Sequence, residues 1–358
     1  MTTQKIFSNL KVLDISTVLA GPSVGTFFAE LGAHVTKIER PSSPDVTRAW
    51  KLPAESEEQI SAYFASVNYG KKYIELDLLE KKDYLAFIHL VEDCDILLMN
   101  FKGGDQEKLR ITDDLLWKAN PKLILGKISG FGEESDRVAY DLILQAEAGF
   151  MSMNGHKDGT PLKMPIALID VLAAHHLKEG LLIALMERTK TNLGSSIEVS
   201  LYDAALCSLA NQASNYLMTG QIPQRMGSLH PNIAPYGEIF STSDGVQLTI
   251  AIGSENHFTK LLQLLNLNDL TSNPLFKNNQ KRVKNRAELE TILSNAIAQL
   301  SSDFLLAELR KSKIPYGEIK SLDKVFVDDR AKSLIREEKQ SKTLTKRMTS
   351  IAFKWKKL

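Results

Sequence analysis

The sequence predicts an α/β protein with a parallel sheet in its first part and a smaller α+β unit later in the chain. Over the first 130 residues, short β-rich segments alternate with helical patterns. Strands that are separated by helices pair in parallel through right-handed crossovers. A stretch rich in proline and glycine from Gly220 to Gly237 then predicts a linker. The length of 358 residues allows roughly two domains of about 150 residues each.

Local patterns predict the elements of the first part. Leu10–Ser16 is apolar enough for a buried strand, and Pro22 suits the first turn of the helix that follows. That helix should end near Leu31, because Gly32 comes next. The other elements expected here are strands at His34–Glu39, Ile74–Leu78, Asp95–Asn100 and Lys122–Ile128, and helices at Lys81–Glu92 and Asp113–Ala119.

From Ala167 onwards the pattern is mainly helical. Helical periodicity extends over Asp170–Thr189 and Ser200–Thr219, with a turn and short strand between them at Asn192–Val199. After the linker, Ser243-Asp244-Gly245 is a good turn for a hairpin. The elements expected in this second unit, residues 225–318, are that hairpin at Glu238–Ile252 and helices at His257–Leu265, Arg286–Leu300 and Asp303–Ser312.

Composition argues against several classes of protein. Lys and Arg number 44 and Asp and Glu 43, so the net charge of +1 gives no global field that would recruit nucleic acid or an anionic membrane. Two cysteines, Cys94 and Cys207, are too few for a disulfide framework. The apolar stretch Val18–Leu31 is too short to span a bilayer, and Met1–Asn9 has no apolar signal core. We therefore expect a cytoplasmic protein.

Several cofactor and nucleophile motifs are absent. The segment Val18–Pro22 after the first strand has a single glycine, whereas a dinucleotide-binding turn needs the GxGxxG spacing. His175 and His176 lie about 100° apart on a helix, so both cannot easily bind one metal ion. HExxH, CxxC and GxSxG motifs are missing. The sequence thus predicts no metal and no tightly bound cofactor.

Basic residues near predicted strand ends admit two interpretations. Arg40 and Lys102 each follow a predicted strand, and Lys71-Lys72 precede another. In an open α/β sheet the ligand crevice lies beyond the carboxyl ends of the strands, so Arg40 and Lys102 would meet a polyanion such as the phosphates of CoA. The alternative is that these residues are solvated surface charges, and composition alone favours that interpretation.

Asp170 also has two interpretations. It lies at the start of the apolar helix that follows Pro165-Ile166-Ala167-Leu168-Ile169. A carboxylate at a helix start can cap the helix. It can also act as a nucleophile on a thioester, forming an anhydride and dividing one difficult acyl transfer into easier steps. The residues themselves leave both interpretations open.

Many ordered segments resemble one enzyme family. They are Leu10–Ser16, Ala20-Gly21-Pro22, Leu31-Gly32-Ala33, Val35–Pro41, Asp45–Arg48 with Trp50, Asn68–Lys72, Glu75-Leu76-Asp77, Asn100-Phe101-Lys102, Ser129–Gly132, Tyr140–Ile143, Glu187-Arg188 with Gly194, Ser200–Ala204 and His230–Tyr236. Together they resemble the class III CoA-transferases, a family of formyl-CoA and carnitine CoA-transferases that also contains the α-methylacyl-CoA racemases. The resemblance extends over nearly the whole chain.

The resemblance implies a fold and a reaction. It implies a large Rossmann-like domain formed by residues 1–220 and 320–358, a small domain at 225–318, and an interlocked homodimer. It implies that Asp170 attacks an acyl-CoA and forms an anhydride and then an aspartyl-CoA thioester, which a carboxylic acid acceptor resolves. The CoA contacts that it implies are Val18, Leu19, Arg40, Lys71, Lys72, Asn100, Phe101, Lys108 and Arg137. Tyr140, Gly253 and Glu255 are further candidates for substrate contact or support.

The chain departs from the family pattern at a few positions. Ala174 stands where a glycine is usual, His175-His176 are uncommon, and the glycine-rich loop is reduced to Ile252-Gly253-Ser254-Glu255. Two alternatives therefore stay open, a racemase and a CoA-binding protein without turnover. The racemases have a histidine where this chain has Tyr140, and tyrosine is a poor base near neutral pH. The donor and acceptor acids are not indicated by the sequence.

Overall fold

The chain forms two compact units in the computed structural model, which describes residues 5–340 and 343–356. The larger unit takes residues up to Phe150, then Lys163–Gln221 and the part from Asp329 onward. The smaller unit consists of Met151–Leu162 and Ile222–Asp328. The segment 151–162, which we expected in the large domain, thus belongs to the smaller unit.

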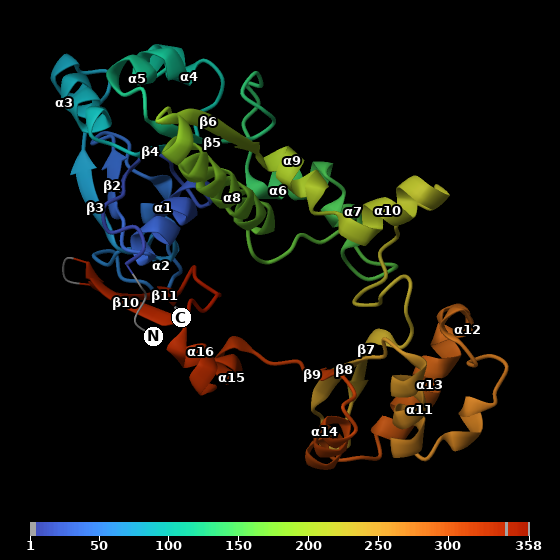
Figure 1. The fold of residues 1–358 in the computed structure, drawn as a ribbon. Helices are drawn as coiled ribbons and strands as arrows, with labels where there is room; N and C mark the ends of the chain where they lie inside the picture. The colour runs from blue at the N-terminus through green and yellow to red at the C-terminus, as the bar shows by residue number, and fades with distance from the viewer. Residues whose placement is uncertain (1–4, 341–342, 357–358) are drawn as a thin grey trace. The chain divides into compact units, whose positions relative to one another are not determined.

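A six-stranded parallel sheet forms the centre of the larger unit, with strand order β3-β2-β1-β4-β5-β6 (Figure 1). Its strands are β1 Lys11–Asp14, β2 His34–Glu39, β3 Lys71–Glu75, β4 Ile96–Met99, β5 Ile124–Ser129 and β6 Ser195–Ser200. Every residue of β4 and β5 is buried, because helices cover both faces of a parallel sheet.

Two apolar layers hold the sheet. On one face, helices α1 (Ala20–Glu30) and α8 (Leu168–Thr191) bury Val24, Phe28 and Leu177 against it. On the other face, α3 (Lys81–Glu92) and α5 (Asp113–Ala119) contribute the buried Phe87 and Leu116. The shorter helices of this unit are η1 Val46–Arg48, α2 Ala62–Ser66, α4 Asp105–Leu109, α6 Asp141–Glu147, α9 Leu201–Cys207 and α10 Ala210–Thr219; α7, Phe150–Met153, leads into the smaller unit.

A C-terminal hairpin completes the larger unit. After α16 (Asp329–Ser333), strands β10 (Ile335–Gln340) and β11 (Thr343–Met348) pair antiparallel. Arg347 forms a buried ion pair with Glu30 of α1. The backbone N–H of Gly70 donates to the Glu338 carboxylate at 3.1 Å. These contacts tie β10 and β11 to α1 and to the segment before β3.

The smaller unit packs helices on a three-stranded antiparallel sheet, in the order β7-β8-β9. Its core contains the buried side chains Phe240, Leu261 and Leu293. The elements are β7 Tyr236–Ser241, β8 Gln247–Ala251, β9 Tyr316–Glu318, α11 Glu255–Leu264, η2 Asn268–Thr271, α12 Asn279–Lys284, α13 Arg286–Ile297, α14 Ser302–Lys311 and α15 Leu322–Val325.

The predicted fold class is confirmed, with local differences. The helix expected over Ser200–Thr219 is two helices, α9 and α10, and the hydroxyl of Ser208 at the break donates to the carbonyl of Ala204 at 2.7 Å. Strand β3 begins at Lys71, three residues before the expected start, because Lys71 and Lys72 pair with Val35 and Thr36 of β2. Among the helices of the described residues, none is long and apolar enough to cross a membrane.

Candidate active site

The start of α8 is capped by Asp141 and not by Asp170. The Asp141 carboxylate accepts from the Ile169 N–H at 2.7 Å and from the Gln145 side-chain amide at 2.6 Å. The N-cap residue of α8 is Ala167, which makes no side-chain cap, so Asp170 is the third helical residue. The interpretation of Asp170 as a helix cap is therefore wrong.

The Asp170 carboxyl group is buried and lacks partners. The residue is only 7% exposed, and no hydrogen bond or ion pair to its side chain is found within 5–340 and 343–356. Burial and, to a smaller extent, the charge of the nearby Asp141 carboxylate together raise the pKa of Asp170 to about 7. A carboxyl group with this pKa is roughly half ionised at neutral pH, and a perturbed acid of this kind is typical of functional sites.

Aromatic side chains lie near the two acids. Burial and the charges of Asp170 and Asp141 raise the pKa of Tyr63 to about 12. The Trp50 ring contacts Tyr63 edge-on at 5.1 Å between centroids, and it also meets Tyr140 at 6.5 Å. Tyr140 is the N-cap residue of α6 and is half exposed. Sequence reasoning missed Tyr63 and Asp141, although Asp141 stands in the Tyr140–Ile143 segment that it had noted.

A pocket of about 270 Å³ opens at the carboxyl ends of β1 to β4. Three residues expected to contact CoA line it together, namely Arg40, Phe101 and Lys108. Apolar side chains that line it include Ile15, Ile38, Leu76 and Leu78. The Arg40 guanidinium donates from Nε to Asp77 at 2.9 Å and is still about half exposed. The pocket therefore combines an apolar wall with two cationic side chains, Arg40 and Lys108. Lys102, which the strand-end argument paired with Arg40, is not among the residues that line it.

Lys71 is placed differently from the exposed cation that we expected. Its Nζ donates to Asp14 at 2.7 Å and to the Pro22 carbonyl and the Asn68 side chain at 2.8 Å each. The side chain is fully buried, and burial lowers the pKa of Lys71 to about 8 although Asp14 opposes this. A CoA contact of Lys71 would require its ammonium to leave Asp14. That contact stays a prediction, whereas Lys72 beside it is exposed.

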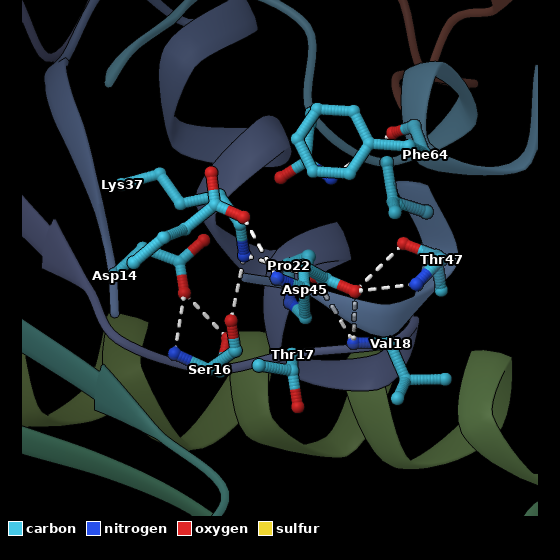
Figure 2. A network of polar contacts seen from close by, with 12 residues as sticks. Asp14, Ser16, Thr17, Val18, Pro22, Lys37, Asp45, Thr47 and Phe64 are labelled. Carbon is cyan, nitrogen blue, oxygen red and sulfur yellow. Dashed lines mark hydrogen bonds and ion pairs between the residues drawn. The ribbon is translucent and has the colours of Figure 1, made fainter. Parts of the chain in front are cut away.

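The turn between β1 and α1 is held by side chains from other elements, as Figure 2 shows for Lys37 and Asp45. Val18 has a φ of 71° and Leu19 is the N-cap residue of α1. A left-handed backbone at a β-branched residue costs about 1–2 kcal/mol. The Asn100 side chain exchanges two hydrogen bonds with the backbone of Thr17, at 2.9 and 2.8 Å.

Arg137 and Glu255, two further candidate residues, each have a partner of their own. Arg137 forms a bidentate pair with Glu147, at 2.6 and 3.1 Å. Gly253 and Glu255 belong to the smaller unit. The Glu255 carboxylate accepts two hydrogen bonds from Arg282, at 2.7 and 2.8 Å.

The family follows from a comparison of the whole chain. The model of CoA-transferase family III matches residues 7–357. The chain belongs to this family. The resemblance predicted from the sequence is thereby confirmed.

Similar proteins agree with this assignment to CoA-transferase family III. The chain is 34% identical to a succinate–glutarate CoA-transferase of Agrobacterium fabrum, covering 90% of this chain and 82% of that protein. It is 33% identical to the mouse succinyl-CoA:glutarate CoA-transferase, covering 90% and 74%. A crystal structure of a CaiB/BaiF family protein from Brucella suis matches with a TM-score of 0.82 and 36% identity, covering 96% of this chain and 92% of that one.

Proposed function

We propose that the protein moves CoA from an acyl-CoA donor to a carboxylic acid acceptor through covalent intermediates on Asp170. Membership of CoA-transferase family III and the names of the relatives support CoA transfer. The observation that carries the role of Asp170 is its buried carboxyl group, which neither caps α8 nor pairs with a cation in the described part of the chain.

The proposed reaction has four acyl transfers. The Asp170 carboxylate attacks the thioester carbonyl carbon, which breaks the C–S bond and yields a mixed anhydride and CoA thiolate. The thiolate then attacks the aspartyl carbonyl of the anhydride, releasing the donor acid and leaving an aspartyl-CoA thioester. The acceptor carboxylate attacks that thioester and regenerates thiolate and an anhydride. Attack of thiolate on the acceptor carbonyl finally gives the new acyl-CoA and free Asp170.

Asp141 has two roles in this proposal. It fixes the first turn of α8 through the Ile169 N–H, and its charge raises the pKa of Asp170. A raised pKa makes the ionised carboxylate a stronger nucleophile, while a value near 7 still leaves a large ionised fraction at neutral pH. Asp141 is thus a positioning and tuning residue for Asp170.

We place the nucleotide part of CoA in the pocket at the carboxyl ends of β1 to β4. Arg40 and Lys108 would meet its phosphates, and Phe101 with the apolar wall would meet the adenine. The Arg40 side chain is about half exposed in its pair with Asp77, which is 20% exposed, so a phosphate can reach the guanidinium at little desolvation cost. The expected contacts at Val18, Leu19, Lys72 and Arg137 remain part of this proposal.

The acceptor is proposed to be a small carboxylic acid, with dicarboxylates first, because the relatives are named for succinate and glutarate. Tyr63, whose pKa is raised by Asp170 and Asp141, could contact the acceptor, as could Trp50 and Tyr140, which form ring contacts next to it. We also propose the interlocked homodimer of the family, which sedimentation velocity with the full chain can test by its mass.

The covalent intermediate can be trapped. Incubation with acyl-CoAs and borohydride or hydroxylamine, followed by peptide mass spectrometry, should show modification at Asp170. The Asp170→Ala variant should bind CoA and show no adduct or exchange, while Asp136→Asn, an exposed control, should behave as the wild type. No adduct over a broad panel, with CoA still bound, would indicate a binding protein. Deuterium entering the α-carbon without any acceptor would instead indicate the racemase.

A further inference from the structure

The turn that joins β1 to α1 is anchored by side chains from several elements. The Ser16 N–H donates to Asp14 at 3.0 Å, and the Ser16 carbonyl accepts from Lys37 at 2.7 Å. The two hydrogen bonds of Asn100 hold Thr17. The Val18 N–H donates to Asp45 at 3.2 Å. The shape of this turn is therefore set largely by side chains from outside it, with one local contact to Asp14.

Asp45 is the contact that opposes the strain at Val18. Valine rarely adopts the left-handed φ of 71° because its branched Cβ crowds the backbone there. The Asp45 carboxylate accepts the Val18 N–H in this conformation, and it also accepts from the N–H and hydroxyl of Thr47 at 3.0 and 2.7 Å.

Asp45 is itself fixed by charge. Lys37 Nζ lies 3.1 Å from its carboxylate, and both side chains are fully buried (Figure 2). The Asp45 N–H donates to Glu39 at 2.9 Å. A buried pair of this kind has little freedom to move, so the position of the Val18 N–H is fixed with it.

The same residues reach the nucleotide pocket. Thr17 and Asp45 line it together with Arg40 and Lys108. We propose that Asp45 is a positioning residue, which keeps the β1–α1 turn in the strained shape that acyl-CoA binding requires. This inference rests on the proposed function, because acyl-CoA is the ligand of that pocket there.

Substitution of Asp45 by asparagine should release the turn. Asparagine has one acceptor oxygen in its side chain, whereas Asp45 now serves Val18, Thr47 and Lys37 with two. The turn can then leave the left-handed conformation at Val18. Val18→Gly removes the strain at its source, because glycine adopts that φ readily. The effect of Asp45→Asn should therefore depend on the residue at position 18.

A double-mutant cycle tests this dependence. KM for acyl-CoA and kcat are measured for the wild type, Asp45→Asn, Val18→Gly and the double variant. Asp45→Asn should raise KM about tenfold with valine at position 18, a change of about 1.4 kcal/mol, and less than threefold in the Val18→Gly background. Amide hydrogen exchange of the peptide over residues 15–21 should become faster in Asp45→Asn and not in Lys122→Ala, an exposed control distant in sequence.

The outcomes separate positioning from a purely structural role. Loss of melting temperature or of kcat with unchanged KM would overturn the inference, as would an equal rise in KM in both backgrounds. If Asp45→Asn does not fold, the pair Lys37→Met with Asp45→Asn leaves no unpaired buried charge and enters the same cycle. A wild type that does not exchange CoA would refute the proposed function instead, and faster amide exchange in Asp45→Asn would still support the clamp on the turn.

Discussion

Replacement of Asp170 by asparagine should stabilise the larger unit, and by an amount that grows with pH. In the unfolded chain this carboxyl group has a pKa near 3.9, whereas in the folded chain burial and Asp141 raise the pKa to about 7. Between about pH 4 and pH 7 the folded chain therefore keeps a proton that the unfolded chain releases. Stability then falls as the pH rises through this window.

The size of the effect follows from the difference between the two pKa values. Ionisation of Asp170 should cost about 4 kcal/mol of folding free energy at pH 8, about 2 kcal/mol near pH 5.5, and little at pH 4. Asparagine does not titrate, so the difference in unfolding free energy between Asp170→Asn and wild type should grow by about 3–4 kcal/mol from pH 4 to pH 8.

Urea unfolding followed by tryptophan fluorescence measures this difference. All three tryptophans, Trp50, Trp117 and Trp355, belong to the larger unit, so the signal reports on the unit that contains Asp170. Midpoints and slopes are compared at pH 4.5, 6 and 8, with Asp136→Asn as an exposed control. An equal difference between Asp170→Asn and wild type at all three pH values would refute the reasoning.

Three further predictions concern activity and packing. Asp141→Asn, which keeps an acceptor for the Ile169 N–H, should lower the pKa of Asp170, so the acid limb of the kcat profile should move to lower pH; an unmoved limb contradicts the coupling. Arg40→Ala should weaken CoA binding several-fold in calorimetry at low salt and less at high salt, and an equal loss at all salt concentrations would argue against a phosphate contact at Arg40. Arg137→Ala tests the expected CoA contact of Arg137, whose guanidinium is paired with Glu147. Arg347→Met should destabilise the larger unit by about 3 kcal/mol, because Glu30 would stay buried without its cation. An unchanged urea midpoint would show that the hydrogen bonds from Thr349 and Ser350 are sufficient to stabilise the buried Glu30 carboxylate.

The elements that the sequence predicted well are those with a strong local signal. The range of β2, His34–Glu39, and that of α3, Lys81–Glu92, agree with the prediction at both ends. The hairpin of β10 and β11 was missed because its charged residues give little apolar alternation, and contacts with distant residues such as Gly70 and Glu30 hold it.

In the candidate site, too, the residues with a local signal were predicted and the contacts between distant residues were not. Asp170 was found because it begins a long apolar helix and matches a family motif. The capping of α8 by Asp141 could not be predicted, since it joins residues 28 positions apart. The burial of Lys71 against Asp14, 57 residues away, likewise depends on which strands become neighbours in the sheet. Local patterns indicate which residues are chemically suited to a role, and only the packed fold decides which of them are already engaged.

The docking of the C-terminal hairpin bears on the order in which the protein folds as it leaves the ribosome. The residues of the smaller unit are all synthesised before β10 and β11, so that unit can become compact early. The larger unit is completed later, because Gly70, Tyr73 and Glu30 lack the contacts that they have in the finished fold until Glu338, Gln340 and Arg347 have emerged. The nascent chain should therefore acquire its ability to bind CoA last, which a series of stalled chains of increasing length would reveal.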